Sequence, residues 1–414
     1  MTFLKQITKN FSSGWQRTLY IMFFAQMITA VGFSTIFPFL PLYVKDLGTN
    51  TGLSLELLAG LVYSGQAFAM MIASPFWGAI ADRYGRKLMV ERTMFGGSVI
   101  LLMMAFVQSA EQLVLLRTIQ GLITGTAAAA SALVAASAPR GRTGYAMGLL
   151  QVGMGAGIAL GPLIGGAIAD VFGYSAVFYV TASLLFTAGV IVLLGVKEDF
   201  EPRLSAGLKL AGIVSEWRHI LSAASVKVTY SMRFLSQLGR MMFIPIAPLF
   251  ILTLFNNTAR LNTFTGLVIG VAATTSTLSA IVLGGLGDRI GHRRIVVISA
   301  GLAALLYFSQ SLVTTGWQLL VLQALIGVTM GGIMPAISAL LADLTQRGEE
   351  GVVYGLDNSI NASSRTIAPL LATAIAVWLG LRATFIATAL LFLVTALLAA
   401  WRLPQSRDIQ TRQE

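Results

Sequence analysis

Five charged side chains lie inside long apolar runs, where the cost of burying a charge implies a functional or structural role. They are one acid and four arginines: Asp357, Arg117, Arg233, Arg240 and Arg365. A charge at the centre of a membrane helix costs about 2.5–3.5 kcal/mol on insertion scales, so such residues face a protein interior or a water-filled path. A carboxylate binds and releases a proton, and a guanidinium pairs with carboxylate or phosphate. The residue types therefore predict proton binding and anion recognition within an apolar environment.

The window around the acid has a helical spacing. Asp357, Asn361 and Arg365 follow one another at intervals of four, which places them on one face of a helix. Asp357 is the only acid deep within an apolar run and is the predicted proton-coupling carboxylate, with Asn361 and Arg365 as candidate substrate-binding residues. The alternatives are a structural Asp–Arg pair, or an Asp357 that lies nearer the cytoplasmic end of its span.

Two further arginines share one face of another span, because Arg233 and Arg240 are seven residues apart. With the other two arginines they leave the interior net positive, which favours substrates that carry a negative or zwitterionic group. Both are candidate substrate-binding residues, although Arg233 could instead extend to the cytoplasmic surface. Gln26, Phe33 and Phe37 in the first span complete the candidate binding set; the two phenylalanines suit an adaptable apolar cavity.

Composition excludes several classes of protein. The chain has 414 residues, of which 56% are hydrophobic and 11% charged, against about 25% charged in soluble domains. It has no cysteine, and its two histidines lie in charged loops, so neither a thiol nor a histidine-based metal site is expected. No phosphate-binding loop of the G-x-x-x-x-G-K-[ST] type occurs, so ATP is not the expected energy source and an enzyme is the least favoured class.

Apolar runs predict an all-α membrane protein with twelve spans. The expected spans are 19–43, 57–80, 90–109, 112–135, 145–169, 174–196, 226–254, 264–286, 295–314, 317–341, 352–379 and 382–402. On one side of the membrane the predicted loops contain only three basic residues, Lys45, Arg260 and Arg382, whereas the loops of the other side and both chain ends are strongly basic. This asymmetry places both termini in the cytoplasm. The net charge of +11 thus reflects topology and contact with the lipid bilayer, and no nucleic-acid partner is expected.

The second half of the chain repeats the first. FPFLPLYV at 37–44 recurs as IPIAPLFI at 244–251, and Gly148 and Pro162 recur as Gly355 and Pro369, all at an offset of 206 or 207 residues. The repeat predicts two pseudo-symmetric six-helix bundles, 1–196 and 226–414, joined by a cytoplasmic linker at 197–225. Parallel six-span repeats are a transporter architecture with a binding site between the halves.

A stripe of glycines marks the fifth span. Gly153, Gly157, Gly161 and Gly165 recur every four residues, so another helix can approach that face closely. Pro162 removes a backbone donor within the same helix. The predicted helix-interface set is Gly148, Gly157, Gly161, Pro162 and Gly165.

A basic loop occurs once in each half. GAIADRYGRK at 78–87 and GGLGDRIGHRR at 284–294 both follow the second span of their repeat. A carboxylate there can pair with arginine or with a helix N-terminus, and could hold the halves together in one state only. The predicted gating residues are Asp82, Arg83, Arg86, Asp288 and Arg289. The alternative is a solvated loop that serves topology alone.

These motifs resemble those of the major facilitator superfamily, and in particular its twelve-span drug:proton antiporters among bacterial multidrug exporters. The 78–87 loop matches the superfamily motif, Leu113 to Gly121 the span-4 motif, and 148–166 the antiporter motif G-x8-G-x3-G-P-x2-G-G at every fixed position. The resemblance implies that Arg117 takes part in proton coupling, that the loop gates, and that span 5 lies at a moving helix interface. The chain departs from many antiporters in lacking a carboxylate in span 1 or span 4.

The combined prediction is a proton-coupled exporter of drugs or small amphipathic metabolites that works by alternating access. It would act as a monomer in the bacterial inner membrane, with a proton gradient in place of a cofactor. One alternative keeps the fold but transports a specific anionic metabolite, siderophore or sugar, in either direction. A second alternative is a receptor or scaffold that transports nothing. The identity of the substrate stays open.

Overall fold

The computed structural model describes residues 14–123, 125–139, 142–198, 224–255, 260–343 and 350–402, and helices make up nearly all of this part of the chain. The first half forms α2 (Gly14–Thr35), α3 (Leu40–Leu47), α4 (Leu55–Tyr84), α5 (Arg86–Met104), α6 (Ala110–Ile123), α7 (Thr126–Ser137), α8 (Thr143–Phe172) and α9 (Tyr174–Gly195). The second half forms α11 (Ala224–Leu254), α12 (Leu261–Ile290), α13 (His292–Gln310), α14 (Gly316–Asp343), α15 (Glu350–Leu379) and α16 (Leu381–Arg402). Most of the predicted linker and both chain ends lie outside the described residues.

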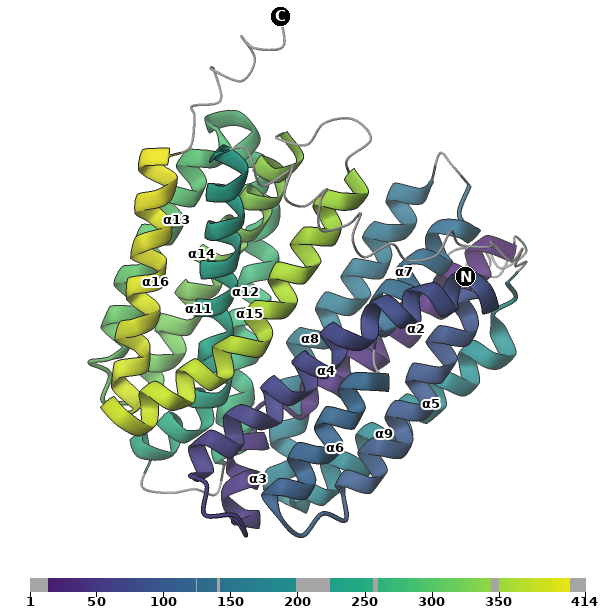
Figure 1. Cartoon of the computed structure of the whole chain (residues 1–414), viewed down its shortest axis with the longest axis horizontal. Helices are drawn as coiled ribbons and strands as arrows, with labels where there is room; N and C mark the ends of the chain where they lie inside the picture. Colours follow the sequence, from purple (N-terminus) through teal and green to yellow (C-terminus); the bar gives the residue numbers. More distant parts are fainter. Residues whose placement is uncertain are drawn as a thin grey trace, which may run out of the picture.

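The helices gather into two bundles, one from each half of the chain (Figure 1). In the first bundle α2 packs on α8 and α9, α4 on α6, and α5 on α9. In the second, α11 packs on α15 and α16, α12 on α14, and α13 on α16. These pairs correspond one to one under the sequence repeat, so the predicted pseudo-symmetric fold is confirmed. Helix α2 begins and α16 ends on the same side, here called the terminal side; the opposite side is called the distal side.

Nine helices of the described chain are long and apolar enough to cross a membrane. The three other predicted spans correspond to α5, to α13, and to α6 with α7. Charged residues at the start of α5 and α13 lower their hydropathy, and the fourth span is interrupted at Gly125, whose φ is +142°. The first span also ends early: α2 stops at Thr35, and α3 begins afresh with Pro41 in its first turn, where a missing N–H costs little.

Four glycines with positive φ form the shortest connections between helices, and they occupy equivalent positions in the two repeats. Gly85 (φ +101°) joins α4 to α5, and Gly291 (φ +96°) joins α12 to α13. Gly173 and Gly380 connect α8 to α9 and α15 to α16 in the same way. Residues with a β-carbon avoid this backbone region, so each glycine permits an antiparallel turn of one residue.

The two bundles meet mainly through α4 with α15 and α8 with α12, and α11 also contacts α3 and α4. On the distal side the contact is direct: a β-carbon at Gly60 would lie 3.0 Å from the Pro369 carbonyl oxygen, and one at Gly266 would collide with the Pro162 carbonyl. On the terminal side the same helix faces are free. Gly78, Gly148, Gly284 and Gly355 lie eighteen residues, about five turns, from the distal contact positions Gly60, Gly166, Gly266 and Thr373. A β-carbon built at any of these four terminal glycines would meet no described atom of another element within 4 Å. The bundles are therefore joined on the distal side and parted on the terminal side.

Candidate functional site

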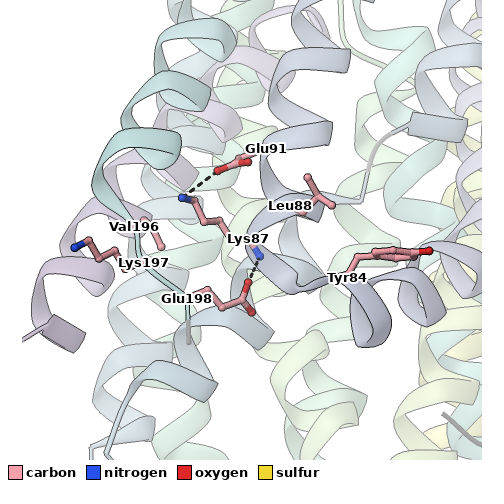
Figure 2. A pocket seen from close by; sticks show the side chains of 7 residues that line it. All are labelled: Tyr84, Lys87, Leu88, Glu91, Val196, Lys197 and Glu198. Atoms are coloured by element: carbon pink, nitrogen blue, oxygen red, sulfur yellow. Dashed lines mark hydrogen bonds and ion pairs between the residues drawn. The ribbon is translucent and has the colours of Figure 1, made fainter. Parts of the chain in front are cut away.

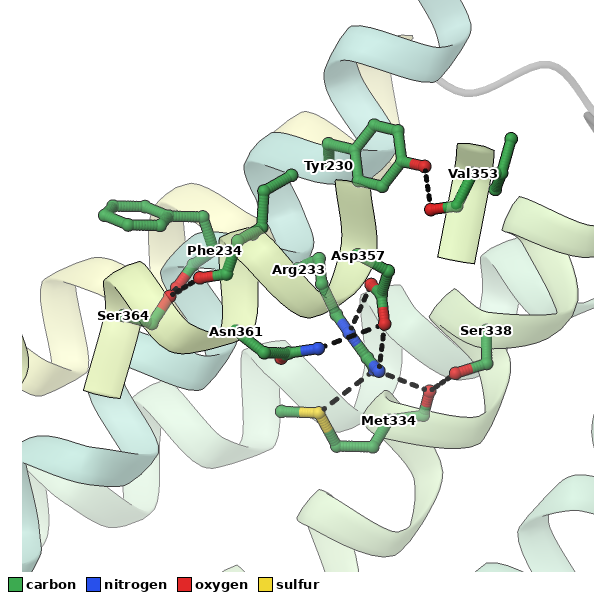
Figure 3. A network of polar contacts seen from close by, with 10 residues as sticks. Tyr230, Arg233, Phe234, Met334, Ser338, Val353, Asp357, Asn361 and Ser364 are labelled. Carbon is green, nitrogen blue, oxygen red and sulfur yellow. Dashed lines mark hydrogen bonds and ion pairs between the residues drawn. The ribbon is translucent and has the colours of Figure 1, made fainter. Parts of the chain in front are cut away.

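An ion pair links α11 to α15 inside the second bundle (Figure 3). The Arg233 Nε donates to Asp357 Oδ1 at 3.0 Å, and Nη2 donates to Oδ2 at 3.1 Å. The side chains are only 13% and 14% exposed. Two parallel hydrogen bonds fix the planes of both groups, which makes this the strongest geometry available to an arginine and a carboxylate.

Neighbouring groups hold the pair in place. The Asn361 Nδ2 donates to Asp357 Oδ2 at 3.0 Å, as their spacing on one helix face predicts. The Arg233 Nη1 reaches the carbonyl oxygen and the sulfur of Met334 on α14. The Tyr230 hydroxyl donates to the Val353 carbonyl at 2.9 Å. These bonds tie α11 to α15 and α14, so loss of the ion pair would be felt in three helices.

Two features of this pair correspond to the alternatives that the sequence left open, a structural Asp–Arg pair and an Asp357 nearer the end of its span. The partner of Asp357 is Arg233, which does not extend to the surface, and not Arg365 of the same helix. Asp357 also lies only seven residues after the start of α15, about 10 Å along a helix of about 45 Å. It is thus nearer the terminal side than the middle of the helix, as the second alternative stated.

Two arginines lie closer to the middle of the molecule. Arg365 stands halfway along α15 and is exposed, while Arg240 stands halfway along α11 and is half-buried. Arg240 lies within electrostatic reach of Arg365 and Arg233, and its buried Nε has no hydrogen-bond partner. Within the described residues neither Arg240 nor Arg365 forms an ion pair.

The first bundle holds one buried arginine. Arg117 on α6 is 1% exposed, and its Nη1 donates to Gln120 Oε1 at 2.7 Å. The Gln66 Nε2 of α4 approaches the same oxygen at 3.4 Å. The Nε and Nη2 of Arg117 have no partner among the described residues. Since buried donors normally find acceptors, this group has unused capacity to bind an anion or a water molecule.

The other candidates of the first span are less accessible than predicted. Gln26 is 2% exposed, and its Nε2 is buried without a partner. Phe33 and Phe37 are half-buried against the core of the first bundle. The Phe37 ring lies 6.0 Å from that of Tyr63, whose hydroxyl donates to the Phe37 carbonyl. In this conformation the first bundle thus shields Gln26 from any substrate.

Three of the four glycines predicted for the helix interface form a close contact with α2. A β-carbon at Gly157 would lie 2.6 Å from the Met27 carbonyl oxygen of α2, and those at Gly161 and Gly165 would collide with Ser34 and with the Thr35 carbonyl. The Pro162 carbonyl meets α12 instead. The prediction for Gly148 is wrong in this conformation: it is exposed with nothing within 4 Å. Five residues separate it from Gly153, which turns it about 140° off the stripe.

Among the described gating side chains, Arg83, Asp288 and Arg289 show no contact that joins the bundles. Asp288 is exposed and pairs with His292 of its own segment at 3.4 Å, and the exposed Arg83 lies over the ring of Tyr84. Arg289 is exposed. The backbone N–H groups of Arg86 and Lys87 both donate to the Glu198 carboxylate, which caps α5. The side chain of Asp82 lies outside the described residues.

A pocket of about 500 Å³ occurs beside this loop (Figure 2), lined by Tyr84, Lys87, Leu88, Glu91, Val196, Lys197 and Glu198. It lies at the terminal ends of α4, α5 and α9, within one bundle. None of the mid-helix arginines or acids lines it. It is therefore a surface hollow next to the cap of α5 and not a site between the bundles.

The sequence reasoning missed a clasp on the distal side. Asp170, near the end of α8, accepts four hydrogen bonds from the start of α12: the backbone N and Nδ2 of Asn262 at 3.1 and 2.8 Å, and the backbone N and Oγ1 of Thr263 at 2.7 and 2.6 Å. A carboxylate at a helix N-terminus is favoured by the helix dipole as well. The sequence feature that could have predicted this contact is an acid, Asp170, directly after the fifth predicted span, together with Asn262 and Thr263 directly before the eighth.

No group of three or more His, Asp or Glu side chains in the described residues is placed to hold a metal ion. The arrangement can bind protons at Asp357 and anions at the free guanidinium groups. It can also change shape, since the two bundles contact each other on one side only.

Comparison with known proteins agrees with this architecture. The family model described as Major Facilitator Superfamily matches residues 22–232 and 229–414. The multidrug resistance protein MdtG of Serratia proteamaculans is 36% identical over 97% of each chain, and that of Salmonella arizonae is 34% identical over 96% of this chain and 98% of the relative.

Solved structures show the same fold at low sequence identity. A bacterial homologue of the human lysosomal transporter Spinster matches with a TM-score of 0.74 and 14% identity, covering 94% of this chain and 96% of that one. The nucleoside transporter NupG matches with a TM-score of 0.75 and 12% identity over 92% and 99%. With both repeats matched by one family model and relatives aligned over nearly their whole length, the chain belongs to the Major Facilitator Superfamily.

Proposed function

We propose that this chain is a secondary transporter that exports drugs in exchange for protons. As a member of the superfamily it is a multi-pass membrane transporter of small molecules and not an enzyme, and such transporters need no cofactor. Export of drugs is supported by the relatives, which are named multidrug resistance proteins over nearly the whole length of the chain. The observation that carries proton exchange is the Arg233–Asp357 pair, which lies within the second bundle.

In this proposal the terminal side faces the cytoplasm of a bacterium, as the basic loops favour, and the protein sits in the inner membrane as a monomer. The two bundles, 1–196 and 226–414, rock about their contacts, with 197–225 as a tether. The conformation described above, parted on the terminal side, is then open to the cytoplasm and ready to take up a drug.

The proton step follows from the chemistry of the ion pair. Protonation turns the Asp357 carboxylate into a neutral acid, which no longer attracts Arg233, so both hydrogen bonds of the pair weaken. Release of the proton restores the carboxylate and the pair. If the drug-loaded form requires the intact pair and the return form the protonated acid, each cycle carries one proton inward per drug expelled.

The remaining candidates take supporting roles in the same cycle. Arg117, buried with unused donors, is proposed to stabilise one protonation state of the path through the first bundle. Arg240, Arg365 and Asn361 face the cargo, and Gln26 becomes accessible only in the opposite conformation. The loops containing Asp82, Arg83, Arg86, Asp288 and Arg289 are proposed to engage when the terminal side closes.

A second candidate function is uptake of an anionic metabolite by the same fold. The observation in its favour is the excess of arginine over acid in the middle of the second bundle. Everted membrane vesicles distinguish the two functions: an exporter accumulates its drug inside them when the proton gradient points outward from their lumen, and an importer does not.

The test combines a drug panel with transport. Growth of a pump-deleted host with and without the chain identifies a drug, whose transport is then measured in proteoliposomes. We expect Asp357→Asn to lose accumulation driven by a pH gradient while exchange of labelled for unlabelled drug continues, because exchange needs no net proton movement. Accumulation by Asp357→Asn at the rate of the unaltered protein would contradict the proposal.

A further inference from the structure

Arg240 and Arg365 stand near the middle of their helices, and neither forms an ion pair with an acid of the described residues. The carboxylate oxygens of Asp357, on the same helix as Arg365, already accept from Arg233 and Asn361. Arg240 lies within electrostatic reach of Arg365. Like charges in a region of low dielectric repel each other, so an anion bound by both groups would lower the free energy of this arrangement.

The helix geometry directs Arg365 toward the space between the bundles. It is exposed at the midpoint of α15, on the face that also carries Asn361. Ile367, which is 45% exposed, lies two residues on and so on the opposite face of the helix, where an apolar side chain meets lipid. The exposure of Arg365 is thus exposure to the interior of the transporter and not to the bilayer.

The repeat shows that the cationic wall has no counterpart in the first bundle. An offset of 207 residues aligns Arg240 with Phe33 and Arg365 with Ile158. Two charged positions in one bundle therefore correspond to two apolar positions in the other. If these positions face each other across the two bundles, the cationic pair and the apolar pair suit a cargo with a negative group at one end and an apolar body at the other.

We propose that Arg240 and Arg365 together form a subsite for the anionic group of an amphipathic cargo, such as a carboxylate, phosphate or sulfonate on an apolar body. Guanidinium groups bind these oxyanions through paired hydrogen bonds, and the buried, unpartnered Nε of Arg240 is one available donor. The inference rests on the transporter fold and deepens the proposed function, but it does not depend on proton coupling.

The first experiment compares two probes that differ only in charge. Binding of 1-naphthoate and of neutral 1-naphthamide to the purified full-length protein is measured by fluorescence at neutral pH. We expect naphthoate to bind about tenfold more tightly than the amide, and Arg240→Gln and Arg365→Gln each to remove this preference while amide binding stays within about twofold. The matched control is Arg294→Gln, which removes an exposed arginine at the start of α13 and should leave the preference intact.

A second measurement needs no cargo and exploits the absence of cysteine. Asn358→Cys places a thiol on the exposed face of α15 that carries Arg365, two turns away. A positive subsite should raise the rate of reaction with an anionic thiosulfonate relative to a cationic one, after both rates are normalised to a free thiol. Adding Arg365→Gln should lower that ratio severalfold, and adding Arg294→Gln should not.

The outcomes separate this inference from the proton-coupling proposal. Loss of anion preference in both arginine variants supports the subsite even if Asp357→Asn still accumulates drug. Equal binding of naphthoate and naphthamide, absence of binding of either probe, or a reagent ratio that Arg365→Gln leaves unchanged would overturn the subsite, whatever the result at Asp357.

Discussion

At the scale of single residues, the stability of the second bundle depends on the hydrogen bonds that one carboxylate accepts. Asp357 accepts from Arg233 twice and from Asn361 once. Removing one partner of a buried pair leaves the other charge uncompensated, which typically costs about 3–5 kcal/mol, whereas replacing both partners costs much less. The pair therefore behaves as a unit in folding as well as in transport.

A double-mutant cycle tests this unit. Arg233→Gln and Asp357→Asn should each lower the unfolding free energy, and the double variant should lower it by less than their sum, with a coupling of more than about 1 kcal/mol. Thermal unfolding in detergent supplies the values. The control cycle of Arg294→Gln with Asp357→Asn should be additive, and additivity in the first cycle would contradict the pairing.

A second carboxylate gives a prediction for pH. The hydroxyl of Thr49, the backbone N–H of Asn50 and the hydroxyl of Thr51 donate to Glu111, which precedes the fourth span, and they lower the pKa of Glu111 from 4.5 to about 2. A lowered pKa means that the carboxylate stabilises the folded protein above its ordinary pKa and loses this effect as the pH falls through the folded value.

Comparison with Glu111→Gln isolates that effect. The unaltered protein should be the more stable of the two at pH 7, and the difference should shrink between about pH 4.5 and pH 2. Melting temperatures across a pH series provide the measurement. A difference that stays constant down to pH 2 would show that the Glu111 contacts do not form in solution.

The charged residues of the candidate site could be predicted from the sequence, but their ion-pair and hydrogen-bond partners could not. A charge within an apolar run identifies Asp357 and the four arginines, because burial of a lone charge is costly. Which arginine pairs with Asp357 depends on the rotation of α11 against α15, and that rotation follows from packing of whole helices. The same limit explains why the free donors of Arg117 were not foreseen.

At the scale of helices, small residues decide where two backbones approach. Gly157, Gly161 and Gly165 bring α8 against α2, where added β-carbons would meet backbone atoms that cannot move aside. The four-residue period was enough to predict this contact. The break of the first span near Pro38 did not follow from the repeat, because the equivalent helix α11 runs unbroken through Pro245 and Pro248.

Alanine substitutions separate the two kinds of glycine in α8. Gly165→Ala should destabilise the protein by about 1–3 kcal/mol, since overpacking forces the backbones of α8 and α2 apart. Gly148→Ala should be neutral or slightly stabilising, because nothing lies within 4 Å and alanine favours the helix. Equal effects in thermal unfolding would contradict the assignment of the interface.

At the scale of the whole molecule, the two bundles are held by distal contacts that must break during transport. The clasp of Asp170 on Asn262 and Thr263 supplies four hydrogen bonds to that closure. The open glycines of the terminal side lie on the same helix faces as the distal contacts. Closure on the terminal side would bring these small-residue faces together. The two bundles therefore have two alternative contact surfaces, one on each side.

Distances between spin labels test whether the distal contact opens as the terminal contact closes. Labels at Tyr145→Cys and Arg294→Cys report the terminal side, and labels at Thr51→Cys and Arg260→Cys report the distal side, all at exposed positions. Asp170→Asn weakens the clasp, so we expect shorter terminal distances and longer distal distances than in the chain with Asp170. Changes of the same sign at both sides, or none, would contradict a rocking motion.

The central claim is that Asp357 exchanges its proton as cargo binds. The most direct measurement is proton release from the purified protein in weakly buffered solution, followed with a pH-sensitive dye as the drug identified by the growth panel is added. The account predicts that, at a pH low enough to protonate Asp357 before the drug is added, binding releases up to one proton per protein from the unaltered chain, because the drug-loaded form requires the ionised pair with Arg233, and that Asp357→Asn releases none. Equal release from both proteins, or binding without any release, would contradict it.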